Sequence, residues 1–329
     1  MHAFVAGSTG VLGRRIVSEL VERGHDVVGL VRDEAGEARV RERGATPRYG
    51  DVLDRDSLVA ATTDTDVVIN AATAIPTAGR PSRADWERND RVRETGTANL
   101  LAAARTNDVD RFVLQSVVWV ARQPDGSRFD ERSEPRPDRT TRSALVAERR
   151  LEAAGIEGTL STCTLRGGWF YAHDAAHTER FGRGLLARRL PVVGGGLLGR
   201  RDATLSYLHV DDAADAFVVA AEGEETGTFH VVDDRPAPFA AFLRRFAERL
   251  GAPPPRRIPG WLARRFVGAD SVRLLTRDMP TTNERFREAF DWEPELSSFE
   301  AGIDRVVDRW LETETIRPTG DGYEWVEGG

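Results

Sequence analysis

The chain of 329 residues contains no lysine, and all 46 of its basic side chains are arginine. The missing ammonium group excludes a Schiff base, a P-loop lysine and a lysine that lowers the pKa of a neighbouring acid. The arginines are spread along the chain rather than clustered, and the formal net charge is −7. This balance argues against electrostatic binding to nucleic acids or anionic membranes, so we expect neither as a partner.

Cysteine and long apolar runs are also scarce. Cys163 is the single cysteine, so no disulfide forms within the chain, and its apolar surroundings predict a buried side chain. No apolar run approaches the ~18 residues of a membrane span. The N-terminal sequence M-H-A-F-V-A-G enters a strand pattern without the charged region of a secretory signal. These features predict a soluble, cytoplasmic protein.

Short apolar runs alternate with amphipathic stretches from residue 2 to about residue 165. The expected helices include Leu12–Glu22, Asn89–Arg105 and Ser143–Ala154. The expected strands are His2–Ala6, Asp26–Val31, Thr46–Tyr49, Val67–Asn70, Arg111–Gln115 and Gly158–Leu165. Strands separated by helices of this length predict βαβ units, and therefore an α/β fold with a doubly wound parallel sheet of the Rossmann type.

The composition changes after residue 166, where glycines and aromatic residues become frequent. Residues 203–233 then resume a strand–helix–strand pattern that is expected to return to the sheet. We therefore predict an NADP-binding Rossmann domain of residues 1–166, completed by 203–233. A smaller, mostly helical substrate-binding region comprises residues 167–202 and 234–312, and residues 313–329 form a poorly ordered tail.

A glycine-rich loop joins the first expected strand to the first helix. Such a loop needs glycine for a tight turn, for close approach of the backbone to a pyrophosphate, and for helix–strand packing. The phosphates then meet the free N–H groups at the helix N-terminus. The position of the loop inside a βαβ unit predicts dinucleotide binding by Gly7, Ser8, Thr9, Gly10, Val11, Leu12 and Gly13.

The end of the second strand indicates which dinucleotide binds. An NAD site usually places an acid there, whereas this strand ends in Val31 and Arg32. Arg32, with Arg14 as a second charge, suits the 2′-phosphate of NADP, so NADP is predicted and NAD is the alternative. Alternatively, both arginines are ordinary solvent-exposed side chains without a role in binding. Adenine and ribose contacts are expected from Asp51, Val52, Ala71 and Ala72, although Asp51 equally suits a helix cap.

Five segments carry a resemblance to a known family. They are G-S-T-G-V-L-G at 7–13, R-F-V-L-Q-S at 111–116, L-R-G-G-W-F-Y at 165–171, Y-L-H-V-D-D-A-A at 207–214 and N-E-R-F-R-E-A-F-D-W-E-P at 283–294. Over about residues 2–310 the chain resembles the extended or atypical short-chain dehydrogenase/reductase superfamily, the group of NAD-dependent epimerases and dehydratases. The resemblance implies a Rossmann fold and a nicotinamide cofactor, and says little about the substrate.

The chain departs from this family at the catalytic residues. The family uses a serine after the fifth strand and a Tyr-x-x-x-Lys pair on the next helix, where the lysine lowers the tyrosine pKa. Ser116 matches the serine, and we expect it beside both cofactor and substrate, but Thr140 occupies the tyrosine position and Ala144 the lysine position. A threonine without a neighbouring ammonium cannot exchange protons near neutral pH, so the standard mechanism does not carry over.

Two residues after the sixth strand are the candidate replacements. Tyr171 follows the Arg-Gly-Gly turn that leads, in the family, past the nicotinamide into the substrate pocket, and His173 titrates nearer neutral pH. Alternatively, Tyr171 only forms part of the pocket wall, and His173 is a solvated loop histidine. Trp169, Phe170 and Tyr171 together predict contacts with an apolar or planar substrate, or else ordinary packing.

The segment H-V-D-D at 209–212 invites a metal-site interpretation. It lies where a strand becomes a helix, so an aspartate there is expected to be an N-cap and His209 a satisfied core histidine. No other spacing of His, Cys and Asp resembles a metal site, and none is predicted.

These patterns predict an NADP-dependent oxidoreductase that moves hydride to or from a small or medium carbonyl-type substrate with a non-standard proton donor. A different interpretation is a non-catalytic NADP-binding redox sensor or assembly subunit, supported by the missing Tyr–Lys pair. A nucleotide-sugar epimerase or dehydratase is a weaker alternative, because that chemistry uses the same pair. The partner is a small-molecule substrate, and the sequence leaves monomer and homodimer open.

Overall fold

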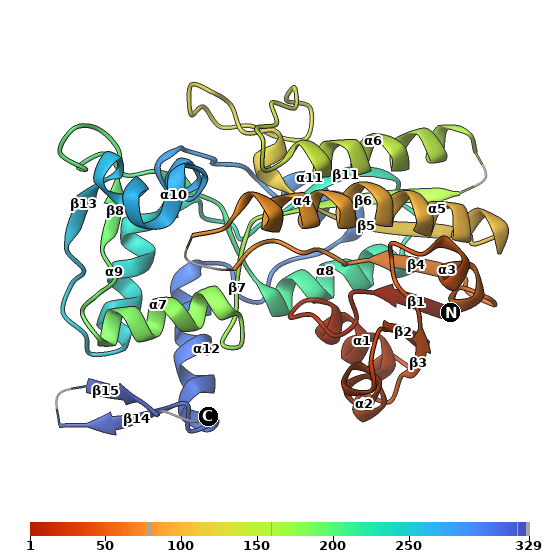
Figure 1. Cartoon of the computed structure of the whole chain (residues 1–329), viewed down its shortest axis with the longest axis horizontal. Coiled ribbons are helices and arrows are strands. Elements are labelled where there is room, and N and C mark those ends of the chain that lie inside the picture. Colours follow the sequence, from red (N-terminus) through yellow and green to blue (C-terminus); the bar gives the residue numbers. More distant parts are fainter. Residues whose placement is uncertain (78–79, 159, 321, 327–329) are drawn as a thin grey trace.

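A seven-stranded parallel sheet forms the centre of the structure, a computed structural model that describes residues 1–77, 80–158, 160–320 and 322–326. The strand order is β11-β6-β5-β4-β1-β2-β3 (Figure 1). The first six strands are β1 His2–Ala6, β2 Asp26–Val31, β3 Thr46–Tyr49, β4 Val67–Asn70, β5 Arg111–Val117 and β6 Ser161–Gly167. The predicted Rossmann-type doubly wound sheet is confirmed, and β1 to β4 have the predicted bounds.

Helices cover both faces of the sheet, which is why its central strands are apolar on both sides. One apolar cluster joins the sheet to α1 (Gly13–Glu22), α2 (Glu34–Glu42) and α8 (Val210–Glu222). The other joins the opposite face to α3 (Arg55–Ala61), α5 (Thr97–Thr106) and α6 (Arg142–Ile156). Figure 1 shows α5 and α6 above the sheet and α1, α2 and α8 below it.

The strand order reverses between β1 and β4. From β1 the chain proceeds outward to β2 and β3, and then crosses back to β4, β5 and β6 on the other side. In sheets of this kind ligands bind at the carboxyl ends of the strands where the order reverses. The loop after β1 and the segment after β4 meet at this point, because Ala71 N–H donates to Ala6 O at 3.0 Å.

The helix predicted at residues 89–105 begins earlier and is not uniform. It begins with α4 (Arg83–Arg91), which Ser82 and Asp85 cap reciprocally, so the Ser-x-x-Asp spacing was the overlooked start signal. A π-helical turn, Val92–Gly96, then separates α4 from α5. Such turns displace side chains from the regular helical pattern and are frequent at functional sites.

Residues 203–233 return to the sheet only in part. β11 (Gly227–Val231) pairs with β6 as the edge strand of the main sheet. β10 (Tyr207–His209) instead pairs with β7 (Trp169–Tyr171), and β9 (Thr204–Leu205) pairs with β12 (Ala237–Pro238). The expectation for the first strand is wrong because β11 already occupies the edge of β6, which leaves residues 204–209 to pair locally.

The C-terminal region has a core of its own, at the left of Figure 1. It is built from helices and one short parallel pair: α7 Ala176–Leu186, α9 Phe239–Arg249, α10 Gly260–Thr276, α12 Phe299–Glu312, β8 Val192–Gly194 and β13 Arg257–Pro259. The intervening helix α11 (Glu284–Phe290) packs instead against β11 of the main sheet. Aromatic side chains dominate this core, and Tyr207 and Phe242 stack with ring centroids 4.9 Å apart. Over the described ranges no helix is long and apolar enough to cross a membrane.

The end of the chain is more ordered than the sequence indicated. Strands β14 (Ile316–Thr319) and β15 (Gly322–Trp325) form a hairpin, and Ile316 is buried. Trp325 packs edge-on against Trp310 with centroids 4.9 Å apart, and the guanidinium of Arg183 lies 4.5 Å from its ring centroid. Aromatic burial therefore stabilises a segment whose Thr, Gly and Glu content suggested disorder. Residues 321 and 327–329 lie outside the described residues.

Candidate functional site

A cavity of about 700 Å³ lies where the strand order reverses. This volume is within the roughly 300–1,000 Å³ range of ligand pockets. The glycine loop, the ends of β2 and β3 and the segment after β4 form its walls. Among the residues predicted to bind the cofactor, it is lined by Gly7, Thr9, Gly10, Val11, Leu12, Gly13, Arg32, Asp51, Val52, Ala71 and Ala72.

The glycine loop is packed so tightly that side chains are excluded from it. Gly7 has a positive φ of 83°, and a Cβ there would lie 2.8 Å from the backbone of Ala71. A Cβ at Gly13 would lie 2.1 Å from Gly7 O. Leu12 precedes α1 without any side-chain cap. The Arg14 and Arg15 N–H groups donate to Gly10 O and Leu12 O, so among the described residues the Gly13 N–H at the start of the helix is left to meet an anion.

Ser8 and Arg14 lie outside the cavity, contrary to their expected contacts with the cofactor. Ser8 is buried beneath the loop, where its hydroxyl donates to Leu30 O at 2.8 Å and fixes the loop on β2. Arg14 pairs with Asp174 in the segment before α7, and Arg15 pairs with the same carboxylate at 3.0 Å. These contacts hold the α7 segment against α1, and they direct Arg14 away from the end of β2.

Two arginines face the far end of the cavity, beyond β2. Arg32 and Arg39 both line it. Asp33 lies between them, but its carboxylate is the N-cap of α2 and accepts the Gly36 N–H at 2.7 Å. Asp51 does not cap α3, since Asp54 does so. Arg39 was missed in the sequence analysis, and its place in the second turn of α2 was the available signal.

The opposite end of the cavity is formed by Gln115, Phe170 and His177, together with residues 73–75, 77 and 174–176. The Nε2 atom of His177 lies 2.7 Å from Phe170 O, so a neutral ring donates there and leaves Nδ1 as an acceptor. Burial lowers the pKa of His177, which keeps the ring neutral. Along the described lining there is no phenol, ammonium or thiol.

Ser116 belongs to a buried ionic network instead of the cavity wall. Its hydroxyl donates to Glu148 on α6. Glu148 also accepts two hydrogen bonds from Arg166, at 3.0 Å from Nε and 2.7 Å from Nη2. Arg166 in turn lies 3.4 Å from His230. With its hydroxyl engaged in this way, Ser116 is not free to orient a substrate carbonyl.

Tyr171 lies in the C-terminal core, where it is 1% exposed. Its ring packs against Tyr207, Phe242 and His209, and its hydroxyl occupies the space where Gly302 lacks a side chain. Burial raises the pKa of the phenol well above its usual value. Tyr171 is therefore neither in the cavity nor poised to release a proton near neutral pH.

The other expected active-site residues are dispersed. His173 is half-buried with Nε2 3.6 Å from Asp174, and burial lowers its pKa. Trp169 packs against Phe239 and the ring of His177 rather than the cavity. Phe170 alone of the three expected substrate contacts lines the cavity. Thr140, in the tyrosine position, donates to Asp138 at 2.7 Å.

The H-V-D-D segment differs from its predicted arrangement. His209, not an aspartate, is the N-cap of α8, and its Nδ1 accepts the Asp211 N–H at 3.3 Å. Its Nε2 is buried without a partner among the described residues, so His209 is only partly satisfied. Asp212 accepts backbone N–H groups of Glu295 and Leu296, and thereby ties α8 to the segment before α12. In the described ranges no cluster of His, Cys, Asp and Glu suits a metal ion.

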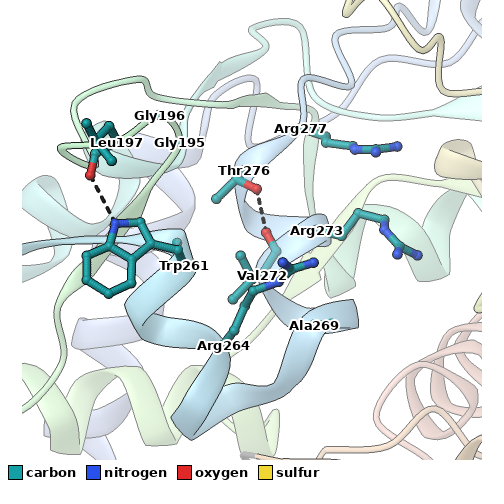
Figure 2. A pocket seen from close by; sticks show the side chains of 11 residues that line it. Gly195, Gly196, Leu197, Trp261, Arg264, Ala269, Val272, Arg273, Thr276 and Arg277 are labelled. Carbon is teal, nitrogen blue, oxygen red and sulfur yellow. Dashed lines mark hydrogen bonds between the residues drawn. The ribbon is translucent and has the colours of Figure 1, made fainter.

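A second hollow of about 480 Å³ lies in the C-terminal region, between α10 and the loop after β8. Figure 2 shows Trp261, whose indole donates to Leu197 O at 3.0 Å, with Arg273 and Arg277 extending to the other side of α10. Trp261 and Leu197 are largely exposed. The two hollows share no lining residue.

Several known proteins are similar to this chain in sequence or in structure. A model of the NAD dependent epimerase/dehydratase family matches residues 3–232. A 3-diazoavenalumate denitrifying reductase from a Streptomyces species is 36% identical over 93% of this chain and 100% of that protein. A 4-hydroxy-2-methyl-3-oxo-4-farnesyl-3,4-dihydroquinoline-1-oxide ketoreductase from Stigmatella aurantiaca is 28% identical over 76% of this chain and 74% of that protein. The UDP-glucose 4-epimerase of Thermus thermophilus, in complex with NAD, superimposes with a TM-score of 0.77 at 24% identity, over 94% of this chain and 99% of that one.

Proposed function

Because the chain belongs to the NAD dependent epimerase/dehydratase family, we propose that it is an oxidoreductase that transfers hydride from NADPH to a small or medium organic substrate. The observation that carries the proposal is the cavity at the strand-order reversal. Its glycine loop and the uncapped N-terminus of α1 suit a pyrophosphate, and the ends of β2 and β4 suit the two nucleoside halves.

The preference for NADP rests on the far end of the cavity. An NAD site usually ends the second strand with an acid for the ribose 2′-hydroxyl, whereas this strand ends in Val31 and Arg32. Asp33 follows, lines the cavity and accepts the Gly36 N–H with Oδ1 as the N-cap of α2. Arg32 and Arg39 both line the cavity, and two guanidinium groups suit a 2′-phosphate. NAD is the alternative cofactor, and comparative affinity distinguishes the two.

The wall at the other end favours a hydride acceptor that needs no proton from the protein. His177 is the one titratable ring there; its Nε2 is engaged by Phe170 O, and burial keeps the ring neutral. An aryl diazonium group is such an acceptor. The hydride and its electron pair form a C–H bond, the C–N bond breaks, its electron pair leaves with dinitrogen, and the nicotinamide is oxidised. We propose this substrate class by similarity to the denitrifying reductase.

Reduction of a carbonyl group is the second candidate, supported by the similarity to a ketoreductase. That reaction needs one proton at the substrate oxygen, which water would supply because Tyr171 lies outside the cavity. His173 is not a lining residue of the cavity either, so it is also poorly placed to donate this proton. Epimerase or dehydratase chemistry is disfavoured by Thr140 and Ala144, which replace the tyrosine and lysine.

The test is oxidation of NADPH by the purified protein in the presence of aryl diazonium salts, ketones, enones and imines, followed by the absorbance of the reduced nicotinamide. Consumption with the diazonium salt above the rate without protein supports the proposal. Consumption with ketones alone assigns the carbonyl reaction instead. Tight binding of NADPH without consumption across the panel would establish the non-catalytic sensor or assembly role.

A further inference from the structure

Arg93 is a buried cation with no partner at its guanidinium Nε among the described residues. Its side chain lies in the π-helical turn between α4 and α5 and is 6% exposed. Burial lowers its pKa to about 10, so it remains charged at neutral pH. A buried charge without a hydrogen-bonded partner is costly, and such a group in a native structure calls for an explanation.

The nearest carboxylates are engaged elsewhere. Asp90 accepts the hydroxyl of Ser143 at 2.6 Å. Glu148 accepts two hydrogen bonds from Arg166 and one from Ser116. Both act on Arg93 through space, without a hydrogen bond to it. The protein therefore supplies negative potential near Arg93 but leaves its Nε donor without a partner among the described residues.

Arg93 belongs to a helical stretch whose residues Arg88 and Val92 line the cavity. Asn89, one turn earlier, accepts the Ala74 N–H at 3.1 Å, and Thr97, one turn later, accepts from Asn70 at 3.1 Å. Arg93 lies between these two residues on the helix; it is not itself a lining residue, but its chain neighbour Val92 and Arg88 in the preceding turn line the cavity. On its other side lies α6, where the small side chain of Ala144 stands in the position of the family lysine.

We propose that Arg93 binds a carboxylate of the substrate, so that the enzyme acts on small organic acids. This inference rests on the proposed reductase function and names the substrate class of that site. A guanidinium presents paired donors that match a carboxylate, and a buried one gains most from such a ligand. The phosphates of the cofactor are accounted for by the N-terminus of α1 and by Arg32 and Arg39, at the other side of the strand-order reversal.

The test measures binding, which does not depend on turnover. Calorimetry of the NADP-loaded protein compares cinnamate with cinnamamide, its neutral match. We expect cinnamate to bind at least about tenfold more tightly, and the Arg93→Met variant to lose that difference while its affinity for NADP stays unchanged. Arg91→Met, an exposed position on the same helix, is the matched control.

Three results would overturn the proposal. Equal binding of acid and amide to the unmodified protein removes the carboxylate preference. Cinnamate binding that survives Arg93→Met assigns the preference to another residue. A loss of NADP affinity in the variant assigns Arg93 to the cofactor. If Arg93→Met does not fold, the relative affinities of the unmodified protein for cinnamate and cinnamamide still test the proposal. Arg93→Lys keeps the charge without the paired donors, and we expect it to bind cinnamate with intermediate affinity. None of these results depends on NADPH oxidation, so the failure of one proposal is distinguishable from the failure of the other.

Discussion

Glu148 accepts both donor arms of Arg166, at 3.0 and 2.7 Å, in a site where each side chain is almost fully buried. The pair links α6 to β6 and also takes the hydroxyl of Ser116. The serine that resembles the family's catalytic residue is therefore part of an ionic network that holds α6 on the sheet. The network predicts a structural role for Ser116, which the sequence analysis assigned to catalysis.

Removal of the carboxylate charge tests that role. Glu148→Gln leaves Arg166 as a buried charge without its counterion, and such losses cost about 3–5 kcal/mol. Ser116→Ala removes one hydrogen bond and is expected to cost about 1–3 kcal/mol, with little change in the rate of hydride transfer. Denaturant unfolding of both variants measures the free energies. A Ser116→Ala variant that folds normally but loses turnover would restore the serine to catalysis.

The 2′-phosphate assignment predicts a selective loss of NADP affinity. Arg39→Ala removes one charged contact from the cavity wall, so the Kd for NADP is expected to rise about tenfold while the Kd for NAD stays unchanged. Arg41→Ala is the matched control, because Arg41 lies on the same helix and pairs with Glu37 instead. Equal changes in the affinities for NADP and NAD would show that Arg39 does not contact the 2′-phosphate.

The glycine loop predicts a steric effect at one position. A methyl group at Gly13 would lie 2.1 Å from Gly7 O, so Gly13→Ala forces the loop away from α1. We expect a loss of about 1–3 kcal/mol in the free energy of unfolding, and loss of NADP binding. Gly320→Ala is the control, since a methyl group there meets nothing within 4 Å. Unchanged NADP affinity in Gly13→Ala would mean that the cofactor binds elsewhere.

His209 predicts a pH dependence of stability. Burial lowers its pKa to about 4, so the folded protein binds fewer protons than the unfolded chain between about pH 4 and 6.5. The stabilisation is complete above pH 6.5 and declines as the pH falls, by about 3 kcal/mol in total. His209→Asn keeps a capping acceptor for α8 without the titration. Thermal unfolding between pH 7.5 and 4.5 should show a smaller decline in this variant, and an identical decline would contradict the assignment.

The sequence predicted those features that follow from local pattern. Apolar runs and amphipathic spacing located the central strands, and the glycine spacing located the cavity. The sequence could not show that Asp33 caps α2 through Oδ1, or that Arg39 in the next turn of that helix lines the cavity with Arg32. The cap and the lining both depend on where side chains lie in the folded chain, and residue spacing does not show which hydrogen bonds a side chain makes.

The catalytic expectations depended on where side chains point, which the pattern does not fix. Tyr171 follows the predicted turn, but β7 pairs with β10, and the phenol lies in the C-terminal core against Gly302. His177 and Arg93 gave no signal because each is significant only through tertiary neighbours. The π-helical turn that carries Arg93 is likewise invisible to helical periodicity.

NADPH that carries deuterium at C4 of the nicotinamide, with para-carboxybenzenediazonium as the acceptor, tests the proposed hydride transfer most directly. We expect deuterium at the ring carbon that carried the nitrogen, one dinitrogen released per NADPH oxidised, and a rate that does not change across neutral pH. A product that carries hydrogen from solvent at that carbon, or NADPH that binds without being consumed, would contradict the proposed hydride transfer.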